Sequence, residues 1–240
     1  MKKLLAIVKA FIKRKIIDFL RKVSGLKTSM DIVVLTLQVC KLLPKPLIAL
    51  EVFGKHGLGV TRDYAHLCDY LELWEIDTIY AKFARKFLPE AVVKIGDSID
   101  AVKTGKLLRN DYNFIVIDNP IVSFFGSGNY CEHFDLFPAL LKRIADKSIL
   151  IMNVVVDMKA IVNNFPYISL KNWTIRRKEF YQKNEDKEVI EPNVETMINL
   201  YKKIVSEEDF TITNAFLVPR DTCMVVLVIV LKRNSKEHPV

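Results

Sequence analysis

Four acidic residues follow four short apolar runs of the sequence at nearly even intervals. They are Glu51, Glu75, Asp97 and Asp118, separated by 24, 22 and 21 residues. Each interval is the length of one strand-plus-helix unit, so the pattern predicts that each carboxylate closes a strand of one parallel sheet. In such sheets, ligands bind beyond the carboxyl ends of the strands. A row of carboxylates there suits a ligand with several donors, such as ribose hydroxyls, an adenine amino group and an ammonium, and it would repel phosphate.

The chain turns sharply after the first of these acids. Residues 51–59 read Glu-Val-Phe-Gly-Lys-His-Gly-Leu-Gly, and glycine allows the backbone to approach a ligand closely. The order G-x-x-G-x-G differs from the dinucleotide fingerprint G-x-G-x-x-G. A nucleotide ligand without a pyrophosphate therefore fits better than a dinucleotide. We interpret His56 as a residue of this binding loop rather than as a catalyst.

Short apolar runs alternate with longer amphipathic segments from residue 47 onward. The runs predict strands at 47–52, 70–76, 91–95, 114–117 and 148–155. The intervening patterns predict helices at 64–70, 79–88, 138–145 and 193–205. Two further runs, 211–217 and 224–231, flank Pro-Arg-Asp-Thr and predict a hairpin. We therefore expect an α/β fold with a doubly wound, mostly parallel seven-stranded sheet, a C-terminal antiparallel hairpin, and an insertion or lid at about 157–192.

Residues 47–155, together with the hairpin at 211–231, resemble the class I S-adenosylmethionine-dependent methyltransferases. The resemblance rests on the four acids in register and on the first turn. It implies a Rossmann-like fold, S-adenosylmethionine as cofactor, and methyl transfer as the activity. One position departs from the family pattern: the glycine usual four residues after the first acid is replaced by Lys55.

The resemblance also implies roles for individual residues. The first motif, which holds the methionine part of the cofactor, corresponds here to Glu51, Phe53, Gly54 and Gly57. Glu75 corresponds to the acid that binds the ribose hydroxyls, with Asp77 as an alternative, and Asp97 to the residue that faces the adenine amino group. Asp118 begins the fourth motif, beside the transferred methyl. Each of these acids could instead simply cap the following helix.

The loop after the fourth predicted strand, residues 118–135, combines aromatic, glycine and ionisable residues where an acceptor should lie. His133 is the candidate general base because its ordinary pKa is nearest neutrality, with Glu132 or Asp135 to orient it. Asp118 is the alternative base. A histidine that is merely hydrogen-bonded in a loop is the structural alternative.

The sequence favours an oxygen nucleophile over a nucleic-acid base. Asn119-Pro120 is followed by Ile121-Val122, whereas amino-directed nucleic-acid methyltransferases carry Pro and an aromatic residue there. We expect O-methylation of a small molecule or a saccharide, including a cell-envelope glycan. A nucleic-acid methyltransferase and a non-catalytic membrane-associated protein that keeps the fold are the alternatives.

Positive charge is concentrated at the N-terminus. Residues 1–29 hold nine Lys or Arg and one acid, Asp18, so their net charge of +8 equals that of the whole chain. The remaining residues are neutral on balance, which makes nucleic acid an unlikely partner for them. Residues 1–25 predict a basic amphipathic helix that ends at Gly25. This helix could bind an anionic membrane surface, pack on the methyltransferase domain at 26–240, or form a homodimer interface.

The remaining composition predicts a cytoplasmic enzyme without a metal, which can lie peripherally at the inner face of the membrane. The four cysteines are scattered without zinc spacing, so no metal is expected. The N-terminus lacks the long apolar run of a signal peptide, and no stretch is long enough to span a bilayer.

Overall fold

The computed structural model describes residues 2–25, 27–118, 136–157, 160, 171–182 and 193–234. Its centre is a sheet of seven strands in the order β3-β2-β1-β4-β5-β7-β6. The strands are β1 (Ile48–Glu51), β2 (Tyr70–Glu75), β3 (Val92–Ile95), β4 (Tyr112–Ile117), β5 (Ile144–Val155), β6 (Phe210–Pro219) and β7 (Met224–Arg233). Strands β1 to β5 are parallel, whereas β7 is antiparallel to both β5 and β6. The predicted mixed sheet and its C-terminal hairpin are confirmed.

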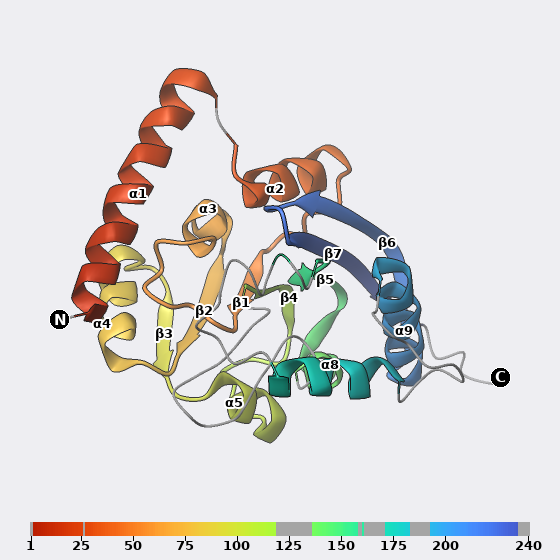
Figure 1. The fold of residues 1–240 in the computed structure, drawn as a ribbon. Helices are drawn as coiled ribbons and strands as arrows, with labels where there is room; N and C mark the ends of the chain where they lie inside the picture. Colours follow the sequence, from red (N-terminus) through yellow and green to blue (C-terminus); the bar gives the residue numbers. More distant parts are fainter. Residues whose placement is uncertain are drawn as a thin grey trace.

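Helices cover both faces of this sheet, as expected for a doubly wound fold (Figure 1). They are α1 (Lys2–Ser24), α2 (Ser29–Val39), α3 (Thr61–Tyr64), α4 (Thr78–Phe87), α5 (Ser98–Thr104), α6 (Phe137–Leu140), α8 (Lys171–Gln182) and α9 (Val194–Glu207). Period-two alternation along β4 divides the core between the faces: Phe114 and Val116 pack towards α2 and α3, and Ile115 and Ile117 pack towards α5, α6 and α9.

Two predicted helices differ from the structure. The predicted helix at 64–70 is wrong in extent, because helix α3 already begins at Thr61, a 3₁₀ turn spans Ala65–Leu67, and Tyr70 starts β2. The predicted helix at 138–145 is shorter, since Ile144 already pairs with Tyr112 and begins β5. In both places strand pairing takes over residues whose local pattern reads as helical.

Helix α2 was absent from the prediction although the sequence carries its start signal. The Thr28 side chain accepts a hydrogen bond from the Asp31 N–H, and the Asp31 carboxylate accepts one from the Thr28 N–H. This reciprocal capping box fixes the first turn of α2. Helix α2 then buries Val33 and Leu37 against the sheet.

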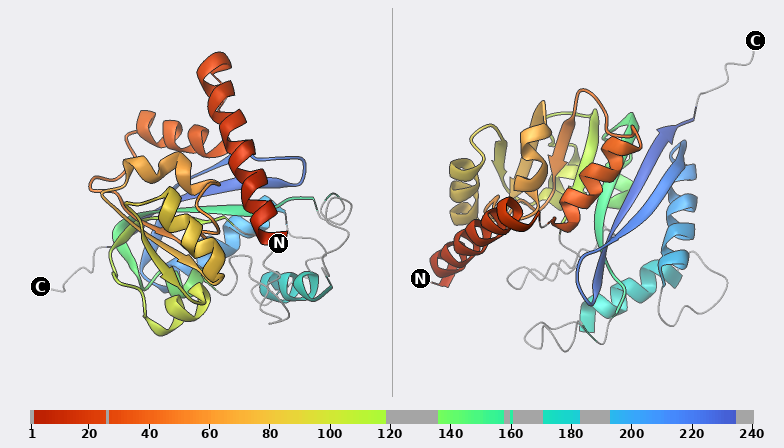
Figure 2. Two further views of the ribbon diagram at one scale, coloured as in Figure 1. Left: turned by 90° about the vertical axis from the view of Figure 1, so that its left-hand side faces the viewer. Right: turned by 90° about the horizontal axis from the view of Figure 1, so that it is seen from above.

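The expected N-terminal helix is present as α1. It ends at Gly25, whose φ of 66° and N–H bond to the Arg21 carbonyl form the C-terminal turn. Helix α1 runs along the edge of the molecule beside α4 (Figures 1 and 2), and the rings of Phe11 and Phe87 stack between the two helices. None of the described helices is both long and apolar enough to cross a membrane.

Candidate cofactor site

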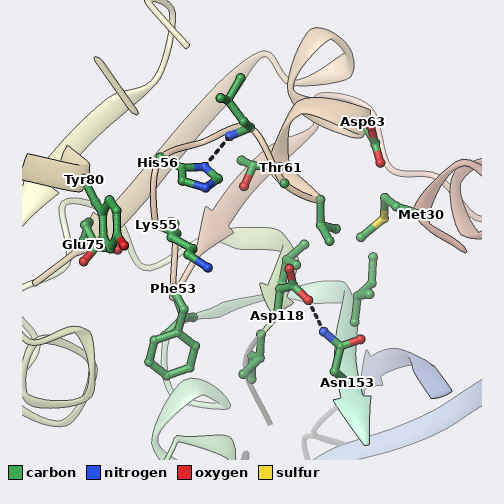
Figure 3. Close-up of a pocket in the computed structure, with 18 of the residues that line it drawn as sticks. Met30, Phe53, Lys55, His56, Thr61, Asp63, Glu75, Tyr80, Asp118 and Asn153 are labelled. Carbon is green, nitrogen blue, oxygen red and sulfur yellow. Dashed lines mark hydrogen bonds between the residues drawn. The ribbon is translucent and has the colours of Figure 1, made fainter. Parts of the chain in front are cut away.

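The carboxyl ends of β1 to β4 open into a cavity of about 810 Å³. Its wall includes three of the four predicted acids, Glu75, Asp97 and Asp118, and the turn that follows β1. Figure 3 shows Lys55, His56 and Phe53 of that turn around the same space. The volume lies within the range of about 300–1,000 Å³ typical of small-molecule sites. The strand register therefore brings together residues that are separated by more than 60 positions in the sequence.

The first turn is tied closely to β2. The Gly54 N–H donates to the Trp74 carbonyl at 2.9 Å, and the Gly57 N–H donates to the Gly54 carbonyl at 3.0 Å. A Cβ on Gly54 would lie 2.1 Å from the Leu73 side chain, so this glycine is required by packing on β2. Of the residues predicted for the first motif, Phe53 and Gly54 line the cavity, whereas Gly57 does not.

Lys55 has a left-handed backbone conformation. Its φ is 49°, in the left-handed region that favours glycine. Its N–H donates to the Glu75 carboxylate, and its ammonium points into the cavity on the side of Asp118 (Figure 3). The turn therefore has a glycine-like conformation at Lys55, and the Lys55 side chain adds a cation to the cavity wall.

Glu75 is held by backbone donors at the end of β2. Only 6% of its surface is exposed, and its Oε1 accepts the Asp77 N–H at 2.7 Å. Burial raises the pKa of Glu75. The N–H groups of Asp77 and Lys55 lower this pKa in part, because they favour the charged carboxylate. These contacts fix one edge of the carboxylate and leave the group at the cavity wall.

Asp77 and Asp97 both cap helices, but only one of them faces the cavity. Asp77 Oδ1 accepts the Ile79 N–H at 2.9 Å, and its other oxygen pairs with Lys3. Asp97 Oδ1 accepts the Ile99 N–H at 2.8 Å, and Asp97 lines the cavity. The capping interpretation is therefore correct for both acids, and position selects Asp97 as the ligand candidate.

Asp118 lies at the end of β4, between the first turn and the C-terminal hairpin. Its Oδ1 accepts hydrogen bonds from Asn153 of β5 and from Arg220, which follows β6 (Figure 3 shows the first). Burial raises its pKa, while the nearby charges of Arg220 and Lys55 favour the carboxylate. Asn153 and Arg220 also line the cavity and were not predicted as site residues. Asn153 could have been found from the sequence, because it is a polar residue within the apolar run of the fifth predicted strand.

Glu51 stands behind the cavity wall. It is fully buried, and its Oε2 accepts hydrogen bonds from the Tyr64 hydroxyl at 2.7 Å and the Thr61 hydroxyl at 3.2 Å. Among the described residues, its Oε1 has no hydrogen-bond partner. Burial, together with the charge of Asp118, raises its pKa to about 8. Glu51 does not line the cavity, but Thr61, which donates a hydrogen bond to Glu51, does. Glu51 therefore contacts the site through Thr61.

His56 and Tyr80 complete the wall near Glu75. Their rings meet edge to face with centroids 5.8 Å apart, and His56 Nδ1 accepts the Leu58 N–H at 3.2 Å. Burial and the charge of Lys55 lower the pKa of His56 to about 4, so the ring is neutral at physiological pH. His56 thus helps to hold the first turn, and its part in cofactor binding stays a prediction.

Residues 119–135 of the predicted acceptor loop lie outside the described residues. This applies to the candidate base His133 and to its proposed partners Glu132 and Asp135. Among the residues that the structure describes, no group of three or more His, Cys, Asp or Glu side chains could hold a metal ion.

No protein-family model matches the sequence, and the search of curated proteins finds no match. Solved structures do match. Trm1 from Pyrococcus horikoshii, in complex with S-adenosyl-L-methionine, is 13% identical with a TM-score of 0.55, over 87% of this chain and 55% of that protein. M. jannaschii TYW2, in complex with AdoMet, is 9% identical with a TM-score of 0.50, over 83% of this chain and 75% of the other.

A third solved structure is the magnesium protoporphyrin IX methyltransferase ChlM from Synechocystis, with bound SAH. It is 14% identical with a TM-score of 0.50, over 86% of this chain and 82% of that chain. At such low identity the shared feature is the fold. The strand order, the antiparallel β7 and these neighbours agree: the chain has the fold of the class I S-adenosylmethionine-dependent methyltransferases.

Proposed function

We propose that this protein is an S-adenosylmethionine-dependent methyltransferase that binds its cofactor in the cavity at the ends of β1 to β4. The observation that carries the proposal is the placement of Glu75, Asp97 and Asp118 on one cavity wall of this fold. Three carboxylates favour a ligand that brings hydroxyl and amino donors and positive charge.

The side chains present fit such a cofactor. Asp97 uses Oδ1 for its helix cap, which leaves Oδ2 to accept from the adenine amino group. We assign Glu75 to the ribose hydroxyls and Asp118 to the region beside the transferred methyl. Phe53, Gly54 and Gly57 form the first turn, with Glu51 behind it. When bound, the cofactor supplies the electrophilic methyl group, and the protein orients it and excludes water.

We propose O-methylation of a small molecule or a saccharide as the reaction, with His133 or Asp118 as the general base. The neutral charge balance of residues 30–240 gives the phosphate backbone of a nucleic acid little net positive charge to bind. The left-handed backbone of Lys55 supports cofactor binding by the first turn, because that conformation is the one that a glycine would favour. We place the enzyme at the inner face of the membrane, where residues 1–25 would bring it to an envelope-glycan acceptor.

Calorimetric titration with S-adenosylhomocysteine tests this proposal. We expect binding with a dissociation constant below about 1 mM, the upper range of enzyme–substrate constants. Asp97→Asn keeps the helix cap but removes the charge, so it should weaken binding by about tenfold, the loss of one charge-assisted hydrogen bond.

Asp77→Asn is the matched control, because Asp77 caps α4 in the same way but does not line the cavity. It should leave the affinity unchanged. Absence of binding to the wild type would refute the cofactor assignment. Equal weakening in both variants would show that the effect comes through the helix caps.

A further inference from the structure

Helix α1 is held to the body of the protein by its charged side. Arg14, with 6% of its surface exposed, pairs with Asp63, and Arg21 pairs with Asp63 at 2.9 Å and with Asp31 at 2.6 Å. At the other end of the helix, Lys3 pairs with Asp77. These basic residues recur at helical spacing and therefore lie on one face. That face is directed inward.

The opposite face of α1 is apolar and exposed. At about 100° per residue, its large side chains lie on the far side of the helix from Arg14 and Arg21. They are Leu5 (55% exposed), Val8 (46%), Ile12 (53%), Ile16 (53%), Phe19 (63%) and Val23 (67%). A helix of a globular protein normally turns its apolar stripe to the core, so this arrangement is inverted. We call these six residues the outer stripe.

Exposed lysines border the outer stripe on both sides. They are Lys9 on one side and Lys15 and Lys22 on the other. The acid of this helix, Asp18, pairs with Arg14 of the same helix at 2.9 Å and faces Arg62 of the body at 4.0 Å. The outward side of α1 therefore combines apolar side chains with positive charge.

We propose that the outer stripe of α1 docks on the surface of an anionic lipid bilayer. An apolar stripe between lysines matches the acyl boundary and the negative headgroups of such a surface. A second copy of this chain is a poorer occupant, because two outer stripes brought together would also bring their lysine borders together. A helix of 23 residues is about 35 Å long and can lie in the membrane plane over its whole length.

The docked orientation bears on the active site, and this consequence rests on the proposed methyltransferase function. Ala10, Arg14 and Ile17, on the inner side of the same helix, line the cavity. A helix with its side chains is about 10–12 Å across. Docking would therefore hold the cavity within about one helix diameter of the bilayer, so that an acceptor attached to a lipid or lying in the headgroup layer could reach it.

Co-sedimentation of the full chain with lipid vesicles tests the docking surface, and no cofactor is needed. We expect binding to phosphatidylcholine vesicles that contain phosphatidylglycerol, weaker binding to pure phosphatidylcholine, and further weakening by salt. The triple variant Leu5→Ser, Ile12→Ser, Phe19→Ser should lose at least about tenfold in partitioning, since three apolar side chains are removed from the interface. The variant Lys9→Gln, Lys15→Gln, Lys22→Gln should lose its preference for anionic lipid.

The matched control replaces three exposed apolar residues elsewhere: Val39→Ser, Leu108→Ser, Leu217→Ser. It should bind vesicles like the wild type. Equal loss in the control, or no binding of the wild type to anionic vesicles, would overturn the proposal. So would a dimer in sedimentation velocity that the outer-stripe variant converts to monomer. A chain that binds vesicles but not S-adenosylhomocysteine would refute the methyltransferase function and leave docking intact.

Discussion

Replacing Lys55 by glycine should stabilise the protein. Its φ of 49° places a residue with a Cβ in the left-handed region, which costs roughly 1 kcal/mol relative to glycine. Lys55→Gly removes this cost. For a chain of this size, about 1 kcal/mol corresponds to a rise in Tm of about 2–4 °C. Lys55→Ala is the control because it removes the ammonium but keeps the Cβ, so it should bring no such rise.

The same two variants report on the charge of Lys55. The ammonium lowers the pKa of His56, in addition to the larger effect of burial. Both variants remove this repulsion, so the pKa of His56 should rise from about 4 in each. Differential scanning calorimetry measures Tm, and an NMR titration of the imidazole protons measures the pKa. Equal Tm values for the two variants would refute the backbone argument, and an unchanged His56 pKa would refute the electrostatic one.

Three further changes probe the parts of the molecule that support the cavity. Glu51→Gln should flatten the pH dependence of the free energy of unfolding. The pKa of Glu51 is raised from 4.5 to about 8 in the folded chain, so unfolding between these pH values releases a proton. The wild type should therefore lose stability as the pH rises from 4.5 to about 8, and the variant should not. Urea denaturation from pH 5 to 8 would show no such difference if Glu51 were already ionised. Arg14→Ala removes one buried partner of Asp63 and should weaken the packing of α1 on the body of the protein by about 3 kcal/mol. Hydrogen exchange over residues 2–24 should then become faster, and unchanged exchange would refute this role of Arg14. Gly54→Ala should cost about 2 kcal/mol or more by overpacking β2, whereas Gly59→Ala, which meets nothing within 4 Å, should be nearly neutral; equal melting temperatures would contradict the packing.

The sheet could be predicted because its signals are local. Alternation of apolar runs with amphipathic segments defines βα units, and the Pro-Arg-Asp-Thr turn between two runs defines the antiparallel pair. Strand and helix boundaries that depend on strand pairing could not be predicted from local patterns. Ile144 reads as the end of a helix, yet it belongs to β5 because it pairs with Tyr112 across a bulge.

The site could be predicted by its strand ends but not in its details. Asp77 and Asp97 have the same local pattern, an acid that caps the helix after a strand, and tertiary position alone directs Asp97 to the cavity. Glu51 closes its strand as predicted, but strand alternation places it with Ala49 on the face of α2 and α3. Asn153 and Arg220 come from β5 and the hairpin, far along the sequence from the acids that they meet.

The orientation of α1 could not have been read from its amphipathic pattern. That pattern predicts an apolar face and a basic face, and the usual expectation turns the apolar face to the core. The acids Asp63, Asp31 and Asp77 on the body of the protein reverse this by pairing with the basic face. The positions of these acids depend on the fold, so the orientation of α1 cannot be predicted from the sequence of α1 alone.

A crystal structure of the protein with S-adenosylhomocysteine would show directly whether the cavity is the cofactor site. We predict that the ligand fills the cavity, with its adenine amino group within hydrogen-bond distance of Asp97, its ribose hydroxyls at Glu75, and its sulfur on the side of Asp118. A ligand bound elsewhere, or a cavity that stays empty at saturating ligand, would contradict the assignment of these three acids.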